Sequence, residues 1–190
     1  MTPKELLSIL TVAGRLKDTT RHCDTPGGRR ESVADHSWRI ALMAMLLTPE
    51  FPDTDMDRVI RMCLIHDLGE AFTGDIPAFD KSAADTGRED RLLADWVAAM
   101  PPETRQEWTT LLTEMDALQT PEARLYKALD KLEAVISHDE SDIHSWLPLE
   151  YDLQLRYGAE NVAFSPYLTA LKEEIDGWTR SKIAESKNMA

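Results

Sequence analysis

The stretch Met62–Asp75, MCLIHDLGEAFTGD, decides how the rest of this chain is interpreted. The residues before its His66-Asp67 pair are apolar nearly all round, which predicts a buried helix. A buried imidazole beside a buried carboxylate destabilises a fold by several kcal/mol unless both are paired or bind a metal. Glu70 follows Asp67 by three residues, so we expect it on the same helix face. The rest of the chain is therefore expected to enclose a site built on this helix.

The remaining sequence predicts further helices and no strands. Capping signals open three of them, at Thr2, Ser32 and Thr120. Gly74 is expected to end the central helix and to leave Asp75 just beyond it. Residues 17–31 are polar and contain Pro26-Gly27-Gly28, which predicts a surface loop, and no segment alternates long enough for a strand. We therefore predict an all-α fold, a helical bundle of seven or more helices, with a last helix over 166–184 and a frayed tail.

Size and composition favour one soluble globular domain over residues 1–190. The chain has 190 residues, of which 43% are apolar and 29% charged, ordinary values for such a domain. Its longest clean apolar run, residues 40–47, is too short to span a membrane, and its N-terminus lacks the form of a signal peptide. Cys23 and Cys63 form no metal or redox spacing motif, so two free thiols are expected. We therefore expect a cytoplasmic protein without a membrane partner.

The net charge of −13 argues against nucleic acid as a partner. The charge is unevenly distributed, however, because the first 30 residues carry a net charge of +3 and the other 160 carry −16. A small anion would therefore find positive charge near the N-terminus, in addition to the charge of any bound metal.

Two other charged segments are expected to be solvated. Arg29 and Arg30 lie in the polar loop, where a solvated arginine is the ordinary case. His138 and His144 lie among acidic residues and could form a weak metal site, but a solvated acidic loop is the favoured interpretation.

Four candidate metal ligands lie on different predicted helices or helix pairs: His36, the His66-Asp67 pair and Asp130. Taken singly, His36 is more typical of a core or capping histidine, and Asp130 of a surface residue. Together they are the ligand types that bind Mn²⁺, Fe²⁺, Co²⁺, Ni²⁺ or Zn²⁺ and leave coordination positions open for water. Such an ion lowers the pKa of a bound water and polarises a phosphoryl oxygen. We therefore expect one divalent transition metal, whose identity the ligand types do not decide.

The ordered set His…His-Asp…Asp resembles the HD-domain metal-dependent phosphohydrolases. Three segments, Glu31–His36, His66–Asp75 and Ala128–Glu133, are similar to the HD-domain 5′-deoxynucleotidases and their eukaryotic relatives. The resemblance covers about residues 5–140, with an HD core over about 30–140. It implies a single HD-type helical domain, and because relatives are often dimers, it also implies a homodimer.

The resemblance also implies a role for each site residue. Glu70 would hold or deprotonate the nucleophilic water, and Asp75 would act near the leaving oxygen or orient the sugar. Arg21, fifteen residues before His36, would bind the substrate phosphate, a task that suits a guanidinium. Bacterial family members often have tryptophan after this arginine, where this chain has His22, which leaves the base or sugar contact open. The implied metal ligands are His36, His66, Asp67 and Asp130.

We therefore expect a metal-dependent phosphoric monoester hydrolase, a 5′-nucleotidase acting on (deoxy)nucleoside monophosphates. Two alternatives stay open at this point. The same site would also serve another phosphate ester, such as a nucleotide polyphosphate, a cyclic nucleotide or a non-nucleotide phosphate. In the second alternative, the chain is a non-catalytic helical binding module whose acids and histidines form a structural hydrogen-bond network.

Overall fold

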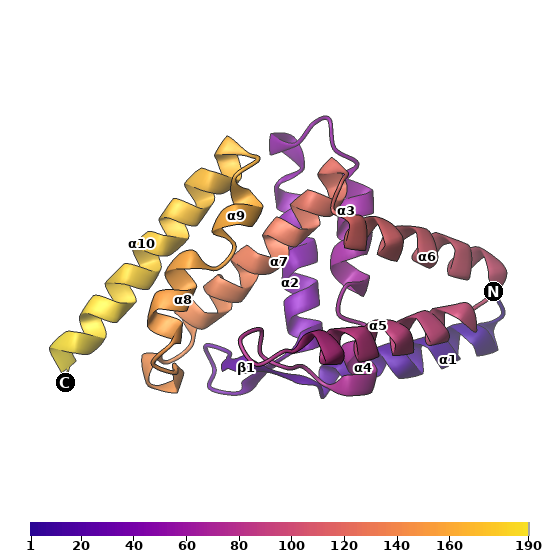
Figure 1. Cartoon of the computed structure of the whole chain (residues 1–190), viewed down its shortest axis with the longest axis horizontal. Helices are drawn as coiled ribbons and strands as arrows, with labels where there is room; N and C mark the ends of the chain where they lie inside the picture. Colours follow the sequence, from indigo (N-terminus) through magenta and orange to yellow (C-terminus); the bar gives the residue numbers. More distant parts are fainter. Residues whose placement is uncertain (190) are drawn as a thin grey trace.

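The computed structural model describes residues 1–189, and nearly all of its regular structure is helical (Figure 1). The longer helices are α1 (Pro3–Ala13), α2 (Val33–Leu46), α3 (Met56–Ile65), α5 (Ala83–Ala98), α6 (Pro102–Ala117), α7 (Pro121–Glu140) and α10 (Pro166–Met189). The shorter ones are α4 (Glu70–Thr73), α8 (Glu150–Arg156), α9 (Ala159–Val162) and the 3₁₀ helices η1 (Gly14–Lys17), η2 (Thr48–Glu50) and η3 (Ile143–Ser145). The prediction of an all-α fold with seven or more helices is confirmed.

The core is built where α2, α3 and α7 pack against one another. Each contributes fully buried aliphatic side chains, such as Ile40 on α2, Met62 on α3 and Leu129 on α7. Burying a side chain of this size stabilises the fold by about 1.5–3 kcal/mol. In Figure 1 the 20-residue helix α7 crosses α2 and α3, so one helix holds the other two in place. These three helices also carry or adjoin the candidate metal ligands.

Capping explains why α2 begins where it does. Ser32 accepts a hydrogen bond from the backbone N–H of Asp35, and Asp35 accepts one from the N–H of Ser32 in return. Such a capping box is worth on the order of 1 kcal/mol and fixes the first turn of the helix. His36 lies in the turn that follows, so the cap sets the position of its imidazole.

The central helix is shorter than predicted. α3 ends at Ile65, His66 is its C-cap, and a hydrogen-bonded turn over residues 66–69 leads to α4. Glu70 therefore begins a new helical turn instead of continuing the face of α3. Gly74 does end α4, as predicted, with a φ of 78° that favours glycine.

The polar segment 17–31 is not a loop throughout. It forms most of a two-stranded antiparallel sheet, in which β1 (Thr20–Asp24) pairs with β2 (Arg30–Ser32). The partners are Thr20 with Ser32 and Asp24 with Arg30, with an irregular register between them. Because both strands are short and the register is irregular, no period-two pattern forms that a sequence could reveal.

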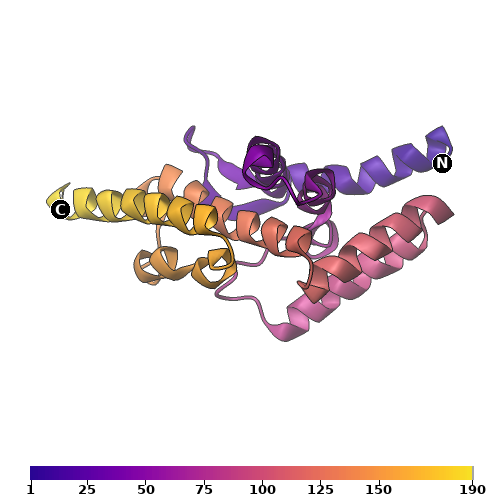
Figure 2. The same ribbon diagram turned by 90° about the horizontal axis from the view of Figure 1, so that it is seen from above.

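The remaining helices lie at the two ends of the core. Figure 2 shows α10 running beside α7 at one end, and α5 lying beside α6 at the other. α10 is longer than the predicted 166–184 and continues into the segment predicted to fray, while Ala190 lies outside the described residues. Within residues 1–189, no helix has both the length and the apolar character of a membrane span.

Candidate active site

The structure brings the four candidate metal ligands together from three parts of the chain. α2 supplies His36, the turn after α3 supplies His66 and Asp67, and α7 supplies Asp130. The His36 Nε2 atom lies 3.3 Å from Asp130 Oδ1 and 3.8 Å from Asp67 Oδ2. The His66 Nε2 atom lies 2.9 Å from Asp67 Oδ2 and 3.8 Å from Asp130 Oδ1. Two imidazole nitrogens and two carboxylate oxygens thus converge on one point.

Both imidazoles are oriented by a contact on their other ring nitrogen. His66 Nδ1 lies 2.9 Å from the Cys63 carbonyl oxygen, which only accepts, so Nδ1 carries the hydrogen. His36 Nδ1 faces the Glu133 carboxylate in the same way. Each Nε2 atom is therefore turned towards the two aspartates, which is the orientation of a metal-ligating histidine.

A buried contact between two acceptors indicates that this cluster fits a cation. Among the described residues, His66 Nε2 is buried and makes no hydrogen bond, because the atom 2.9 Å from it, Asp67 Oδ2, is also an acceptor. The donor atoms of His36, His66 and Asp67 lie within 4.8 Å of one another, close enough to share an ion. Two histidines and two carboxylates suit a divalent transition metal. The chain thus contains a His/Asp cluster of the kind that holds such an ion.

Two lysines of α7 flank the cluster. Lys127 Nζ lies 2.9 Å from Asp130 Oδ2, and Lys131 Nζ lies 3.4 Å from the same atom. Burial opposes the ionised form of Asp130, but the two ammonium groups hold the pKa of this carboxyl well below its usual range. Asp130 is therefore an anion and is able to act as a ligand.

Glu70 and Asp75 lie beside the cluster, in the same pocket. Burial raises the pKa of Glu70, and the carboxylates of Asp67 and Asp75 raise it further. Burial also raises the pKa of Asp75. Glu70 Oε2 is buried and has no hydrogen bond among residues 1–189. A buried carboxyl with a raised pKa and a free oxygen is suited to accepting or donating a proton.

A pocket of about 330 Å³ opens onto this cluster. Arg21 and His22 of β1 form one wall, the loop from Asp75 to Lys81 forms a second, and Gln154 of α8 belongs to a third. The sequence-predicted residues Arg21, His22, Glu70 and Asp75 all line this pocket together with three of the four candidate ligands, His36, Asp67 and Asp130.

Arg21 lines the pocket while being held from behind by two carboxylates. Its Nη1 atom lies 2.6 Å from Glu31 Oε2 and 3.2 Å from Glu133 Oε2. Its Nε and Nη2 groups make no hydrogen bond among the described residues. A fixed guanidinium with free donors is suited to binding an oxyanion.

The far wall of the pocket corrects the interpretation of segment 138–144. His138 and the buried Asp139 lie in the last turn of α7 and are not part of a solvated acidic loop, whereas Asp142 and His144 are exposed, as predicted. His138 Nε2 lies 2.9 Å from Glu150 Oε1, and His22 Nε2 lies 3.6 Å from the same oxygen. The helical pattern of α7 continues to Glu140, and its last turn contacts Glu150 of α8 and Thr179 of α10, which composition alone does not reveal. Arg29 and Arg30 are largely exposed, as predicted.

Sequence reasoning gave no role to several residues that shape this site. The spacing offered one signal, because Glu133 follows Asp130 by three residues and therefore lies on the same face of α7. No such signal marks Glu31 or Gln154, which reach the site only through the tertiary fold.

Comparison with known proteins identifies the protein family to which this chain belongs. The family described as HD domain matches residues 13–172, and this chain belongs to it. The 5′-deoxynucleotidase HDDC2 of Homo sapiens is 30% identical over 72% of this chain and 68% of its own length. The protein of the same name from Mus musculus is 31% identical over 71% and 69%. The resemblance to HD-domain phosphohydrolases of the 5′-deoxynucleotidase type is thereby confirmed.

Solved structures agree with this assignment. A crystal structure described as a predicted metal-dependent phosphohydrolase from Magnetospirillum magnetotacticum MS-1 has a TM-score of 0.77 and 29% identity, covering 94% of this chain and 93% of that one. The cyanophage S-2L HD phosphohydrolase DatZ, described as bound to dA and one catalytic Zn²⁺ ion, has a TM-score of 0.58 and 22% identity, covering 92% and 96%. At that identity, the second likeness concerns the fold alone.

Proposed function

We propose that this protein is a metal-dependent 5′-nucleotidase that releases phosphate from deoxynucleoside monophosphates. The observation that carries the proposal is the convergence of His36, His66, Asp67 and Asp130 beside a pocket that also holds Arg21. Relatives that share about 30% identity over two thirds of this chain are named 5′-deoxynucleotidases, which supports the same reaction.

The four converging side chains would hold one divalent transition metal: Mn²⁺, Co²⁺, Fe²⁺, Ni²⁺ or Zn²⁺. When bound, the ion would supply a Lewis acid for the phosphate and lower the pKa of a bound water. The rest of the reaction falls to the protein's own side chains, which position the phosphate and move protons.

Arg21 would bind the phosphate through its free Nε and Nη2 groups, because Glu31 and Glu133 occupy Nη1. With a cation bound, its charge would lower the raised pKa of Glu70, which would then take the proton of the attacking water on Oε2, the oxygen without a partner. Asp75 would orient the sugar or protonate its 5′ oxygen as the ester bond breaks. The raised pKa of Asp75 favours the protonated form that such a step needs.

The nucleoside would extend away from the metal towards α8. The His22 ring lies edge-on to Phe79 at 5.6 Å, so the two rings offer an apolar wall to a sugar or base. Gln154 is only 4% exposed, lines the pocket, and its side-chain amide makes no hydrogen bond among the described residues. An amide can donate and accept, so it would contact a polar edge of the nucleoside.

We also propose a single HD-type domain over residues 1–190 that forms a cytoplasmic homodimer. Large apolar side chains stay more than half exposed on α1, at Leu7 and Leu10, and on α2, at Trp38 and Leu46. Exposed apolar side chains of this size favour contact with another chain. Both cysteines are free and buried, which is in keeping with a reducing compartment.

A panel of phosphate esters tests the activity. Purified protein with added Mn²⁺ or Co²⁺ is incubated with deoxynucleoside monophosphates, ribonucleoside monophosphates, a nucleoside triphosphate, a cyclic nucleotide and a sugar phosphate, and phosphate release is measured. We expect release from the deoxynucleoside monophosphates. Turnover of another class alone would replace this proposal with that ester, and release from none would support a non-catalytic binding module.

A further inference from the structure

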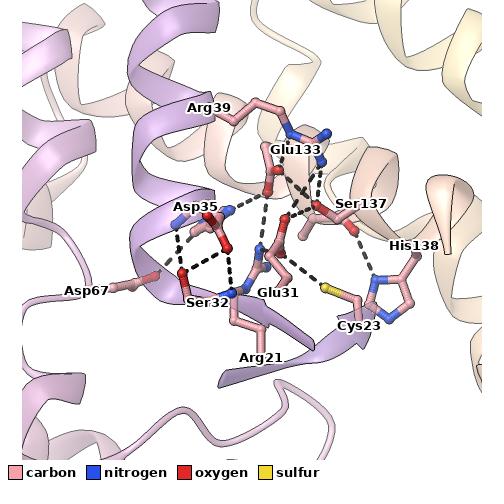
Figure 3. Close-up of polar contacts among 12 residues, drawn as sticks. Arg21, Cys23, Glu31, Ser32, Asp35, Arg39, Asp67, Glu133, Ser137 and His138 are labelled. Atoms are coloured by element: carbon pink, nitrogen blue, oxygen red, sulfur yellow. Dashed lines mark hydrogen bonds and ion pairs between the residues drawn. The ribbon is translucent and has the colours of Figure 1, made fainter. Parts of the chain in front are cut away.

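Glu133 lies where α2, α7 and β1 meet, and it is completely buried. Its Oε2 atom contacts His36 Nδ1 and lies 3.2 Å from Arg21 Nη1. Its Oε1 atom accepts hydrogen bonds from Arg39 Nε at 2.6 Å and from the Ser137 hydroxyl at 2.8 Å. Figure 3 shows the Glu133 carboxylate at the centre of these contacts. One carboxylate therefore touches both a candidate metal ligand, His36, and the arginine proposed to bind phosphate, Arg21.

The contacts follow from matching spacings on two packed helices. On α2, His36 and Arg39 are three residues apart, and on α7, Asp130 and Glu133 are also three residues apart. Residues at this spacing lie on the same face of a helix. Because α2 and α7 pack together, His36 contacts both acids through its two ring nitrogens, and Arg39 reaches Glu133 one turn further on.

The neighbouring carboxylate of Glu31 provides an internal comparison. Glu31 also binds Arg21 Nη1, at 2.6 Å, and its Oε1 atom lies 2.8 Å from the Ser137 hydroxyl, whose single hydrogen is shared between Glu31 and Glu133. No contact between Glu31 and His36 is present among residues 1–189. Glu31 and Glu133 thus share Arg21, but only Glu133 touches His36.

The charges in this cluster depend on one another because they are shielded from water. A fully buried carboxylate is costly unless cations and hydrogen-bond donors surround it, and Arg21, Arg39 and His36 meet that need for Glu133. Without Glu133, His36 would lose the anion that makes its Nε2 atom a stronger electron-pair donor to a metal. Arg21 would then be free to move towards Glu31.

We infer that Glu133 is a positioning residue that couples the two halves of the site, setting the His36 imidazole for the metal and the Arg21 guanidinium for the phosphate. Among the described residues Arg39 contacts neither His36 nor Arg21, and it lies 3.9 Å from Glu31 but 2.6 Å from Glu133, so Glu133 is its shorter route to the site. The inference rests on the proposed function, since it gives His36 and Arg21 the roles assigned there. It goes beyond that function by linking metal affinity to phosphate affinity through one side chain.

The test compares Glu133→Gln with its matched control Glu31→Gln. Metal-stripped protein is titrated with Mn²⁺ by calorimetry, and inorganic phosphate is then titrated at saturating Mn²⁺. We expect Glu133→Gln to weaken Mn²⁺ binding about tenfold or more and to weaken phosphate binding as well. Glu31→Gln should weaken phosphate binding and leave Mn²⁺ binding unchanged. Unchanged Mn²⁺ binding in Glu133→Gln, or an equal loss in both variants, would overturn the inference.

Arg39 supplies a second, independent variant in case Glu133→Gln does not fold. Arg39→Met should weaken Mn²⁺ and phosphate binding together, and Arg39→Lys should restore part of both. Where Glu133→Gln folds, adding Arg39→Met should have little further effect on Mn²⁺ binding, because Arg39 affects His36 through Glu133. Additive effects would show that Arg39 does not act through Glu133.

These readouts separate the inference from the proposed function. Both measure binding, so they hold even if no phosphate ester is turned over. A wild-type protein that binds Mn²⁺ and phosphate but hydrolyses nothing would end the nucleotidase proposal and leave the coupling intact. If the wild type hydrolyses nucleotides but Glu133→Gln binds Mn²⁺ as tightly as the wild type does, the nucleotidase proposal stands and the coupling is refuted. A wild-type protein that binds no Mn²⁺ would overturn both.

Discussion

Replacing Gly158 with alanine tests how closely the chain after α8 is fitted to the site. Gly158 has a φ of 78°, and a Cβ atom added there would lie 2.8 Å from the Cβ atom of Lys131 on α7. Lys131 Nζ in turn donates to the Tyr157 hydroxyl at 2.8 Å and lies 3.4 Å from Asp130 Oδ2. The substitution therefore pushes on a residue that touches a candidate metal ligand.

Gly28 provides the matched control because it has a φ of 80° but open space where a Cβ atom would lie. A left-handed backbone costs alanine about 1–2 kcal/mol, and the reduced entropy of the unfolded chain offsets about 0.4–1 kcal/mol of this. Gly28→Ala should therefore lower the free energy of unfolding by about 1.6 kcal/mol or less. Gly158→Ala should lower the free energy of unfolding by about 1–3 kcal/mol more than Gly28→Ala does, because the contact with Lys131 forces α9 away from α7.

Urea unfolding followed by circular dichroism measures both values on the same protein background. The KM for a deoxynucleoside monophosphate should rise in Gly158→Ala and stay unchanged in Gly28→Ala, since only the first displaces the wall of the pocket. Equal losses of stability in the two variants would refute the close contact between Gly158 and Lys131. If Gly158→Ala loses more stability than Gly28→Ala but keeps the wild-type KM, the contact with Lys131 is structural only.

Three further predictions address the proton-moving residue, a buried acid and the nucleoside contact. Glu70→Ala should keep its Mn²⁺ and lose on the order of 10²–10⁴ in kcat, measured by phosphate release and metal analysis; loss of the ion would make Glu70 a ligand instead. Burial raises the pKa of Asp139 to about 6, so the folded state binds this proton more tightly than the unfolded state does. The stabilisation it contributes is complete below its ordinary pKa of 3.8 and is lost as the pH rises through about 6. Asp139→Asn, which can still accept from Thr179, should therefore raise the unfolding free energy at pH 8 by at most about 3 kcal/mol and give no gain at pH 4 in urea titrations. Gln154→Leu should change the order in which kcat/KM ranks the four deoxynucleoside monophosphates, but not the hydrolysis of p-nitrophenyl phosphate, which has no base. Substitution of the exposed Gln106 by leucine is the control. An unchanged order would show that Gln154 does not contact the nucleoside.

The sequence predicted those features that depend on local pattern or on an ordered motif. The caps at Thr2, Ser32 and Thr120 open helices as expected, because a capping box, as at Thr2 and Ser32, or a simple N-cap, as at Thr120, is complete within four residues. The four candidate ligands also come together as predicted, although they are 94 residues apart at the extremes, from 36 to 130. Their order along the chain, matched to a known family, carried information that no local pattern holds.

Features that depend on tertiary contacts were wrong or missing. The hairpin of β1 and β2 is too short and irregular to show a strand period, so the sequence predicted a loop. His138 and Asp139 looked solvated because nothing local reveals that Glu150 of α8 and Thr179 of α10 contact the end of α7. Arg21 was expected to bind phosphate, but nothing local indicates that Glu31 and Glu133 hold its guanidinium, because those pairings exist only after α7 packs against β1.

Metal binding by one ligand variant tests the central claim most directly. Metal-stripped wild-type protein and the variant Asp130→Asn are titrated with Mn²⁺ by calorimetry, with circular dichroism to show that both are folded. If His36, His66, Asp67 and Asp130 close around one ion, the wild type will bind one Mn²⁺ per chain, and Asp130→Asn will bind it far more weakly while staying helical. Equal Mn²⁺ affinity in the two proteins, or a metal-stripped wild type that hydrolyses nucleotides at full rate, would contradict the account.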